Sequence, residues 1–245
     1  MTGGQAVVES LKVNAVDTVV GLIGSSTLEI LDALYDSKNI RYIGCHDERS
    51  GIIMSDAYAR MKNKHGVFLA GQAGPGATNT ITGLAQAKAA FSPVVSLAGA
   101  ISSEHEGKDA FQEVDQQSLF TPVTKKSFKI SDTKDIHSVM QEAFKVAITP
   151  RMGPVNINLP RDVMGKTSDF QDPMKYQIDK LPEAKVSSLM KSPPARPSRF
   201  PESRATNISG SIPCFVASLT EMDDPSINLL GSICFGFPST SSRGS

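Results

Sequence analysis

Tryptophan is absent from this sequence of 245 residues, cysteine occurs three times, and neither sign of charge is in excess. Lys and Arg together number 25, as do Asp and Glu, so the composition favours neither nucleic acid nor an anionic membrane as a partner. Cys45, Cys214 and Cys234 lie far apart, which argues against a disulfide framework or a cysteine-based zinc site. The four histidines lack metal-ligand spacing, so no metal ligands are expected.

Long apolar runs are also missing. None approaches the roughly 18 residues that cross a bilayer. The first residues lack the basic and apolar regions of a signal peptide. We therefore expect a soluble, cytoplasmic protein.

Short apolar runs alternate with helical patterns over the first two thirds of the chain. Six short runs are predicted to be strands, the first of them because it is β-branched and ends at Gly24, and the fourth because it opens with a proline. They span residues 17–23, 40–44, 66–70, 93–98, 124–130 and 154–159. Helical patterns occupy residues 27–35, 47–62, 77–90 and 133–147. The alternation predicts a doubly wound α/β fold, with a mainly parallel six-stranded sheet, helices on both faces, and residues 124–130 at an edge.

Two of these helices carry an apolar stripe at helical spacing, which is typical of a face packed in the core. The stripes consist of Met54, Tyr58 and Met61 in the second helix and of Ile136, Met140, Ala143 and Ala147 in the last. Thr27 and Thr133 are predicted to cap the first and last helices.

The composition changes near residue 187. Residues 187–245 contain 14 serines and 7 prolines, which interrupt any long helix or central strand. The predicted organisation is a folded domain over residues 1–167, a linker over 168–186, and an irregular or disordered tail over 187–245.

Candidate chemistry lies where strands end, because ligands of such sheets bind beyond the carboxyl ends of the strands. The glycine-rich turn 71–79 can cradle an anion or simply allow tight packing, and its spacing fits neither a dinucleotide fingerprint nor a P-loop. Glu48 begins the second helix, where an acid can be functional or merely favoured by the helix dipole. The long polar connection 99–122 is typical of a binding loop.

Six short motifs occur in order along the chain. They are His46-Asp-Glu48, Asp56-Ala-Tyr-Ala-Arg60, Gly74-Pro-Gly-Ala-Thr-Asn79, Ala110-Phe-Gln-Glu113, Thr121-Pro-Val-Thr-Lys125 and Gly153-Pro-Val-Asn-Ile-Asn-Leu-Pro160. Together they make residues 3–167 similar to the N-terminal, pyrimidine-binding domain of thiamine-diphosphate-dependent enzymes, and in particular to that of the acetolactate synthase large subunit.

The resemblance implies that Glu48 is the catalytic glutamate, which bonds to N1′ of the aminopyrimidine of the cofactor. It further implies that the cofactor contacts Glu48, Gly24, Ser25, Gly74, Pro75, Gly76 and Asn79, and that the substrate side is formed by Phe111 and Gln112. The sequence departs from the acetolactate synthase pattern in the turn 24–27 and at Asp47, which replaces a histidine. These departures leave relatives such as sulfoacetaldehyde acetyltransferase open.

The activity implied is decarboxylation of pyruvate and carboligation to a second 2-keto acid, in branched-chain amino acid synthesis. In this family Mg²⁺ and the diphosphate are held by a separate domain marked by Gly-Asp-Gly, a motif that this sequence lacks. FAD, present in full acetolactate synthases, cannot be inferred here. We therefore expect a truncated chain that is inactive alone and works as a homodimer or with a chain carrying the diphosphate-binding domain. A subunit of a split 2-keto acid decarboxylase and a non-catalytic binding module are the alternatives.

Overall fold

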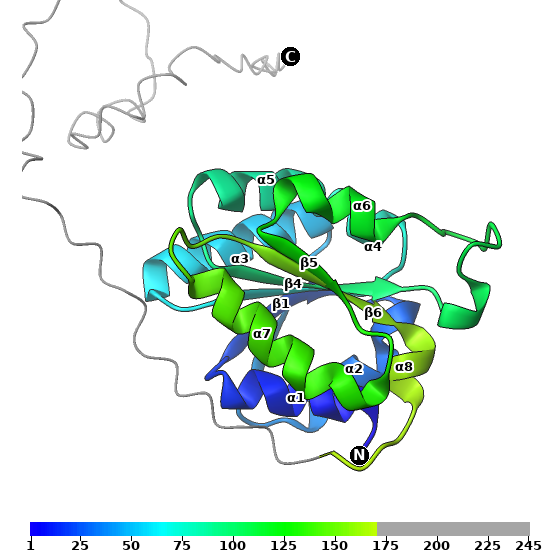
Figure 1. The fold of residues 1–245 in the computed structure, drawn as a ribbon. Coiled ribbons are helices and arrows are strands. Elements are labelled where there is room, and N and C mark those ends of the chain that lie inside the picture. Colours follow the sequence, from blue (N-terminus) through cyan, green and yellow to red (C-terminus); the bar gives the residue numbers. More distant parts are fainter. Residues whose placement is uncertain (171–245) are drawn as a thin grey trace, which may run out of the picture. The chain divides into compact units, whose positions relative to one another are not determined.

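The computed structural model describes residues 1–170, which form a parallel six-stranded sheet between two layers of helices (Figure 1). The strands are β1 (Thr18–Leu22), β2 (Arg41–Gly44), β3 (Gly66–Ala70), β4 (Val94–Ala100), β5 (Lys126–Lys129) and β6 (Val155–Pro160). Their order is β2-β1-β3-β4-β6-β5, and every neighbouring pair is parallel. All six predicted strands, the α/β class and the edge position of β5 are confirmed.

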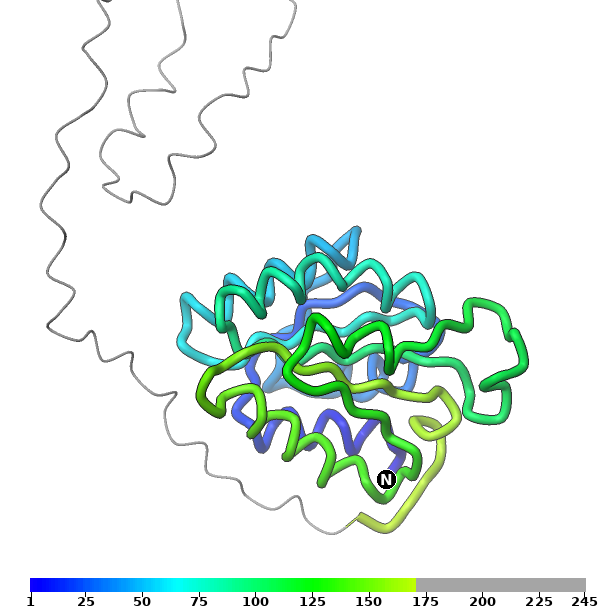
Figure 2. Tube along the Cα trace, turned by 45° about the horizontal axis from the view of Figure 1, so that its top comes forward, coloured from blue at the N-terminus to red at the C-terminus, as the bar shows by residue number. Residues whose placement is uncertain are grey.

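The helices divide into two layers. They are α1 (Gly3–Val13), α2 (Leu28–Asp36), α3 (Glu48–Lys62), α4 (Pro75–Asn79), α5 (Ile81–Ala89), α6 (Gln116–Phe120), α7 (Ile136–Ile148) and α8 (Arg161–Gly165). Helices α1, α2, α7 and α8 cover one face of the sheet and α3 to α6 cover the other (Figure 1). Figure 2 shows α1 and α7 side by side on the first face.

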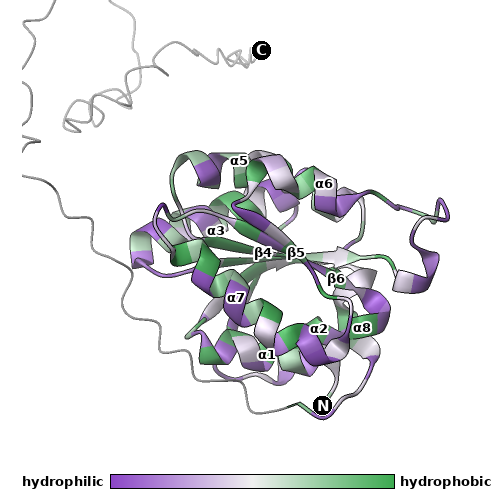
Figure 3. Cartoon of the chain, in the orientation of Figure 1, coloured by the Kyte–Doolittle hydropathy of each residue, from purple (hydrophilic) through white to green (hydrophobic). Residues whose placement is uncertain are grey.

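Side chains of the central strands alternate between two buried cores. In β3, Val67 and Leu69 join the core beneath α1 and α7, whereas Phe68 and Ala70 join the core beneath α3 and α5. Because both faces are covered, these strands read as continuous apolar runs rather than as alternating ones. Figure 3 shows the hydrophobic strands between helices whose outer faces carry hydrophilic residues.

Thr27 is the N-cap residue of α2 as predicted but makes no capping hydrogen bond, and the predicted cap at Thr133 is wrong, because Asp135 precedes α7. Thr27 precedes α2, but its hydroxyl points to the carbonyl of Gly71 at 3.5 Å and caps nothing. Thr133 starts a short 3₁₀ turn before α7, and its hydroxyl donates to the carbonyl of Val163 at 3.0 Å. In both places a buried carbonyl, in the loop after β3 for Thr27 and in α8 for Thr133, accepts the hydroxyl that a cap would use.

The predicted packing of the stripe on α3 is also wrong. Met61 is 84% exposed and Met54 is 42% exposed. The buried face of this helix consists of Glu48, Gly51, Ile52, Ser55, Asp56 and Ala59. Small residues there bring the helix close to β3, because a Cβ on Gly66 would lie only 2.0 Å from the carbonyl oxygen of Ser55. By contrast, the predicted face of α7 is buried throughout.

Three helices have no counterpart in the prediction: α1, α6 and α8. The connection 99–122, expected to be irregular, contains α6 and two 3₁₀ turns. The predicted helix 77–90 is instead α4 and α5, separated at Thr80.

The predicted boundary at residue 167 falls just after α8 and stays a prediction. The predicted linker, from residue 171 on, and the predicted tail lie outside the described residues. In residues 1–170, no helix is long and apolar enough to cross a membrane.

Candidate functional site

The loops that follow β1 and β3 meet closely at the carboxyl edge of the sheet. The amide of Ser26 donates to the carbonyl of Gly71 at 3.0 Å, and the amide of Gly71 donates to that of Leu22 at 3.0 Å. A Cβ on Gly24 would lie 2.3 Å from the carbonyl carbon of Gly71, and one on Gly71 would lie 2.3 Å from the nitrogen of Gly24. Only glycine fits at either position, so the two loops form one surface.

Glu48 is buried beside these loops. It is the first residue of α3, directly after Asp47, whose side chain caps the helix by accepting the amide of Ser50 at 2.9 Å. These hydrogen bonds from Ser50 lower the pKa of Asp47. The side chain of Glu48 is 7% exposed, and the helix N-terminus favours its negative charge.

The two carboxyl oxygens of Glu48 have different surroundings. Oε2 accepts a hydrogen bond from Nδ2 of Asn79, the last residue of α4, at 3.0 Å. Oε1 faces Gly76, where a Cβ would lie 3.6 Å from it and 3.4 Å from Cβ of Gln72. Within residues 1–170 we find no donor to Oε1. One oxygen is therefore fixed, while the other borders a space that an alanine at Gly76 would fill.

The turn that carries Gly76 has a fixed shape. Gly74 has φ +64°, and a Cβ there would lie 2.3 Å from the carbonyl oxygen of Gln112, so glycine is required on both counts. Pro75 follows as the first residue of α4, where its missing amide hydrogen is not needed, and it is exposed.

A chain of polar side chains connects three loops at this edge. The amide and hydroxyl of Ser25 both donate to Oε1 of Gln72 at 3.1 Å. Nε2 of Gln72 in turn donates to Oε1 of Gln112. The adjacent Phe111 is 86% exposed and makes no part of this chain.

Seven of the residues predicted for the site thus lie in one connected region. They are Gly24, Ser25, Glu48, Gly74, Gly76, Asn79 and Gln112. Pro75 lies between two of them and faces solvent, and Phe111 projects away. The sequence analysis did not predict Gln72 as a site residue, although its position inside the glycine-rich turn 71–79 indicates that it lies at the site.

A cavity of about 270 Å³ lies next to this region, beneath the connection between β4 and α6. Gly74, Gln112, Gln117, Lys129 and Asn158 contribute to its lining, whereas Glu48 and Asn79 do not. It is therefore a neighbour of the region around Glu48 and not the same space.

Two further features bear on the chemistry. Cys45 is a half-buried free thiol that donates to the carbonyl of Gly21 at 3.3 Å, and burial raises its pKa, so it remains protonated. In the part of the chain that the structure describes, no cluster of three His, Cys, Asp or Glu could hold a metal ion.

Fold and geometry together define a parallel α/β domain whose candidate ligand site lies at the carboxyl edge of the sheet, around one buried carboxyl group. Residues 1–119 match the family described as thiamine pyrophosphate enzyme, N-terminal TPP binding domain. This N-terminal part of the chain belongs to that family.

Its relatives are acetolactate synthase large subunits. It is 38% identical over 190 residues to a probable acetolactate synthase large subunit of Methanocaldococcus jannaschii, a match that covers 77% of this chain and 32% of the relative. It is 40% identical over 171 residues to the isozyme 2 large subunit of Escherichia coli, covering 70% of this chain and 31% of the relative. It is 38% identical over 178 residues to the acetolactate synthase large subunit of Corynebacterium glutamicum, a match that covers 73% of this chain and 28% of the relative. The chain thus spans about a third of the length of these relatives.

Proposed function

We propose that this chain supplies the pyrimidine-binding half of a thiamine diphosphate site in an enzyme of the acetolactate synthase type. The reaction would be decarboxylation of pyruvate and carboligation to a second 2-keto acid. One observation carries the proposal: Glu48 is buried at the carboxyl edge, with Oε2 held by Asn79 and Oε1 facing the space beside Gly76.

The residues present fit an aminopyrimidine. A flat ring that offers a nitrogen to Oε1 needs a neighbouring residue without a side chain, and Gly76 is that residue. When bound, thiamine diphosphate supplies a carbon nucleophile and an electron sink for the loss of CO₂. Glu48 would hold a proton between Oε1 and the ring nitrogen N1′, and Asn79 would keep the carboxyl group oriented. Gln112, turned toward Gln72, would stand on the substrate side together with Phe111.

In this proposal the remaining parts of the site lie outside residues 1–170. Mg²⁺ and the diphosphate would be held by a diphosphate-binding domain, either in a second copy of the full protein or in a separate chain. FAD is not inferred from this chain, and the location is expected to be the cytoplasm. A subunit of a split decarboxylase, a related acetyltransferase and a non-catalytic module remain as outcomes of the test.

The test is calorimetric titration with thiamine diphosphate and Mg²⁺. The chain is titrated alone and mixed with the C-terminal segment of the M. jannaschii relative that follows the matched region. We expect tight binding in the mixture only, together with exchange of the C2 proton of the cofactor seen by NMR. Absence of binding in the mixture would favour a non-catalytic module, and binding with pyruvate decarboxylation but no carboligation would favour a split decarboxylase.

Two variants sharpen this test. Glu48→Gln should slow C2 proton exchange by about 100-fold or more while the fold is kept, because the amide cannot hand over a proton. Gly76→Ala should weaken cofactor binding without loss of stability, since its methyl group meets ordinary contacts and fills the space beside Oε1. Gly165→Ala is the matched control, because its Cβ would also meet a glutamate oxygen at ordinary contact distance, Oε1 of Glu29 at 3.8 Å. Unchanged exchange in Glu48→Gln would refute the assignment.

A further inference from the structure

The connection between β4 and α6, which projects from the sheet in Figure 1, is folded around the carboxyl group of Glu113. One oxygen, Oε1, accepts the amide hydrogen of Gly107, and Oε2 accepts that of Ala110 at 2.9 Å. The amide of Glu113 itself donates to the carbonyl of Ala110 at 2.9 Å. Residues 107–113 therefore form a closed loop with one side chain at its centre.

This loop needs such a centre because its backbone is strained. Gly107 has φ +75°, Asp109 has φ +53° and Gln112 has φ +64°. Asp109 and Gln112 are not glycine, so the left-handed conformation costs free energy that neighbouring contacts must offset. The hydrogen bonds from Gly107 and Ala110 also lower the pKa of Glu113, which keeps the carboxylate charged at neutral pH.

The strained loop turns two neighbouring side chains in opposite directions. Gln112 turns inward, with its carbonyl against Gly74 and its side chain bonded to Gln72. Phe111 turns outward and is 86% exposed. A loop without these two bonds to Glu113 would be free to relax the backbone at Gln112, and the direction of both side chains would be lost.

We propose that Glu113 is a positioning residue: it holds the loop 107–113 so that Gln112 faces the candidate site and Phe111 its outer rim. That these two side chains then meet a 2-keto acid rests on the proposed function. Glu113 touches neither Glu48 nor Gln72 and acts only through the backbone of its own loop.

The orientation is tested on the full chain without any ligand. Glu113→Gln keeps the size but places an NH₂ group against one of the two amides, so we expect amide exchange of residues 105–114 to be about tenfold faster or more, and the side-chain amide signal of Gln72 to shift. Exchange in α7 and the unfolding midpoint should stay as in the unmodified chain. Glu104→Gln is the control, because its carboxylate lies in the same loop, is 75% exposed, and has His105 at 3.7 Å as its partner. Unchanged exchange in Glu113→Gln, or equal acceleration in Glu104→Gln, overturns the proposal.

The consequence for substrate is tested in the mixture with the diphosphate-binding segment. In Glu113→Gln we expect the KM for pyruvate to rise about fivefold or more while the Kd for thiamine diphosphate stays within about twofold. Glu113→Asp, which keeps the charge, should recover part of the loss. Faster exchange with an unchanged KM overturns the positioning role. If the unmodified mixture shows no activity at all, the proposed function fails, whereas the exchange and the Gln72 signal still decide whether Glu113 orients Gln112.

Discussion

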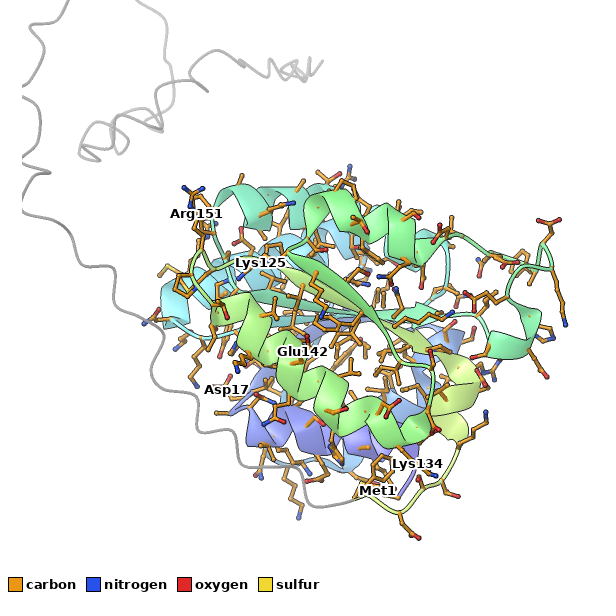
Figure 4. All side chains as sticks on the ribbon, in the orientation of Figure 1. Met1, Asp17, Lys125, Lys134, Glu142 and Arg151 are labelled. Atoms are coloured by element: carbon orange, nitrogen blue, oxygen red, sulfur yellow. The ribbon has the colours of Figure 1, made fainter. Side chains whose placement is uncertain are left out.

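At the residue scale, Asp56 is a carboxylate with a fully buried side chain. Its oxygens accept hydrogen bonds from Nε and a terminal nitrogen of Arg60, at 3.1 Å each. They also accept one from Nε2 of Gln86 at 2.9 Å, and this bond connects α3 to α5. Asp56→Asn should lower the free energy of unfolding by about 1–3 kcal/mol, because it weakens the charge-assisted hydrogen bonds to a buried carboxylate, while the Arg60 side chain that stays behind is 53% exposed. Urea unfolding measures this. Glu142 is labelled in Figure 4 and forms an exposed ion pair with Lys126, so Glu142→Gln should change this free energy by less than about 1 kcal/mol. Equal losses in both variants would contradict the prediction.

Alanine substitutions at two glycines of the site should have different effects on stability. Gly24→Ala should destabilise the fold by about 1–3 kcal/mol, because its Cβ would lie 2.3 Å from backbone atoms of Gly71 that cannot move aside. Gly76→Ala should leave stability unchanged or slightly raised, since the nearest atom to its Cβ is 3.4 Å away and alanine favours the helix. Thermal unfolding of both variants decides the point, and similar midpoints would show that the contact at Gly24 can relax.

The site was partly predictable at this scale. The strand ends and the six motifs pointed to Glu48, Asn79 and the glycine turn, because these depend on order along the chain. The polar chain through Gln72 and the outward direction of Phe111 depend on three loops meeting and on left-handed backbone in residues 107–113. The glycine-rich turn marks the place of Gln72, but nothing in the spacing or hydrophobicity of the sequence indicates its hydrogen-bond partners or the direction of Phe111.

At the element scale, hydrophobic periodicity succeeded for α7 and failed for α3. Met140 is fully buried, whereas Met61 is 84% exposed. Helix α7 meets the sheet through large side chains, so its stripe marks the buried face. Helix α3 meets it through Gly51, Ser55 and Ala59, so the buried face looks polar or small in the sequence. Helix α1 had a readable signal that was missed: Thr2 and Gln5 form a capping box.

This difference between the two helices predicts a difference in stability. Met140→Ala should lower the free energy of unfolding by about 2–5 kcal/mol, because it opens a cavity in the core. Met61→Ala should change it by less than about 0.5 kcal/mol, because the side chain already faces solvent. Denaturant unfolding of the two variants checks this. A large loss at Met61 would mean that another part of the chain or a second copy covers it.

At the scale of the whole described domain, the sequence predicted the number of strands, their direction and the edge position of β5. These follow from local patterns and from the crossover rule for parallel strands. The order β2-β1-β3-β4-β6-β5 was not predicted, since it depends on which strands pair across the sheet. Burial beside the start of β3 also lowers the pKa of a histidine that the composition alone does not single out.

That residue is His65, which joins the start of β3 to α7. Its Nε2–H donates to the carbonyl of Phe144 at 3.1 Å, and burial lowers its pKa from 6.5 to about 4. Between pH 6.5 and about 4, His65 is protonated in the unfolded chain but stays neutral in the folded chain. The contribution of the neutral, buried His65 to stability is therefore complete above pH 6.5 and is lost as the pH falls toward about 4. The full loss is about 3 kcal/mol.

Burial also lowers the pKa of His137, so this histidine too makes the fold less stable as the pH falls. The contribution of His65 must therefore be obtained as the difference between the unmodified chain and a His65 variant. The free energy of unfolding is measured from about pH 7 to about pH 4 for the unmodified chain and for His65→Gln, which can still donate to Phe144 but does not titrate. His65→Gln should be the less stable at about pH 7, because the ring packs edge-on against Phe144 at 4.8 Å, and the gap should narrow steadily as the pH falls. His105→Gln, at an exposed histidine, is the control for the same substitution outside the core. A gap of constant size would show that His65 is protonated in the folded domain to the same degree as in the unfolded chain.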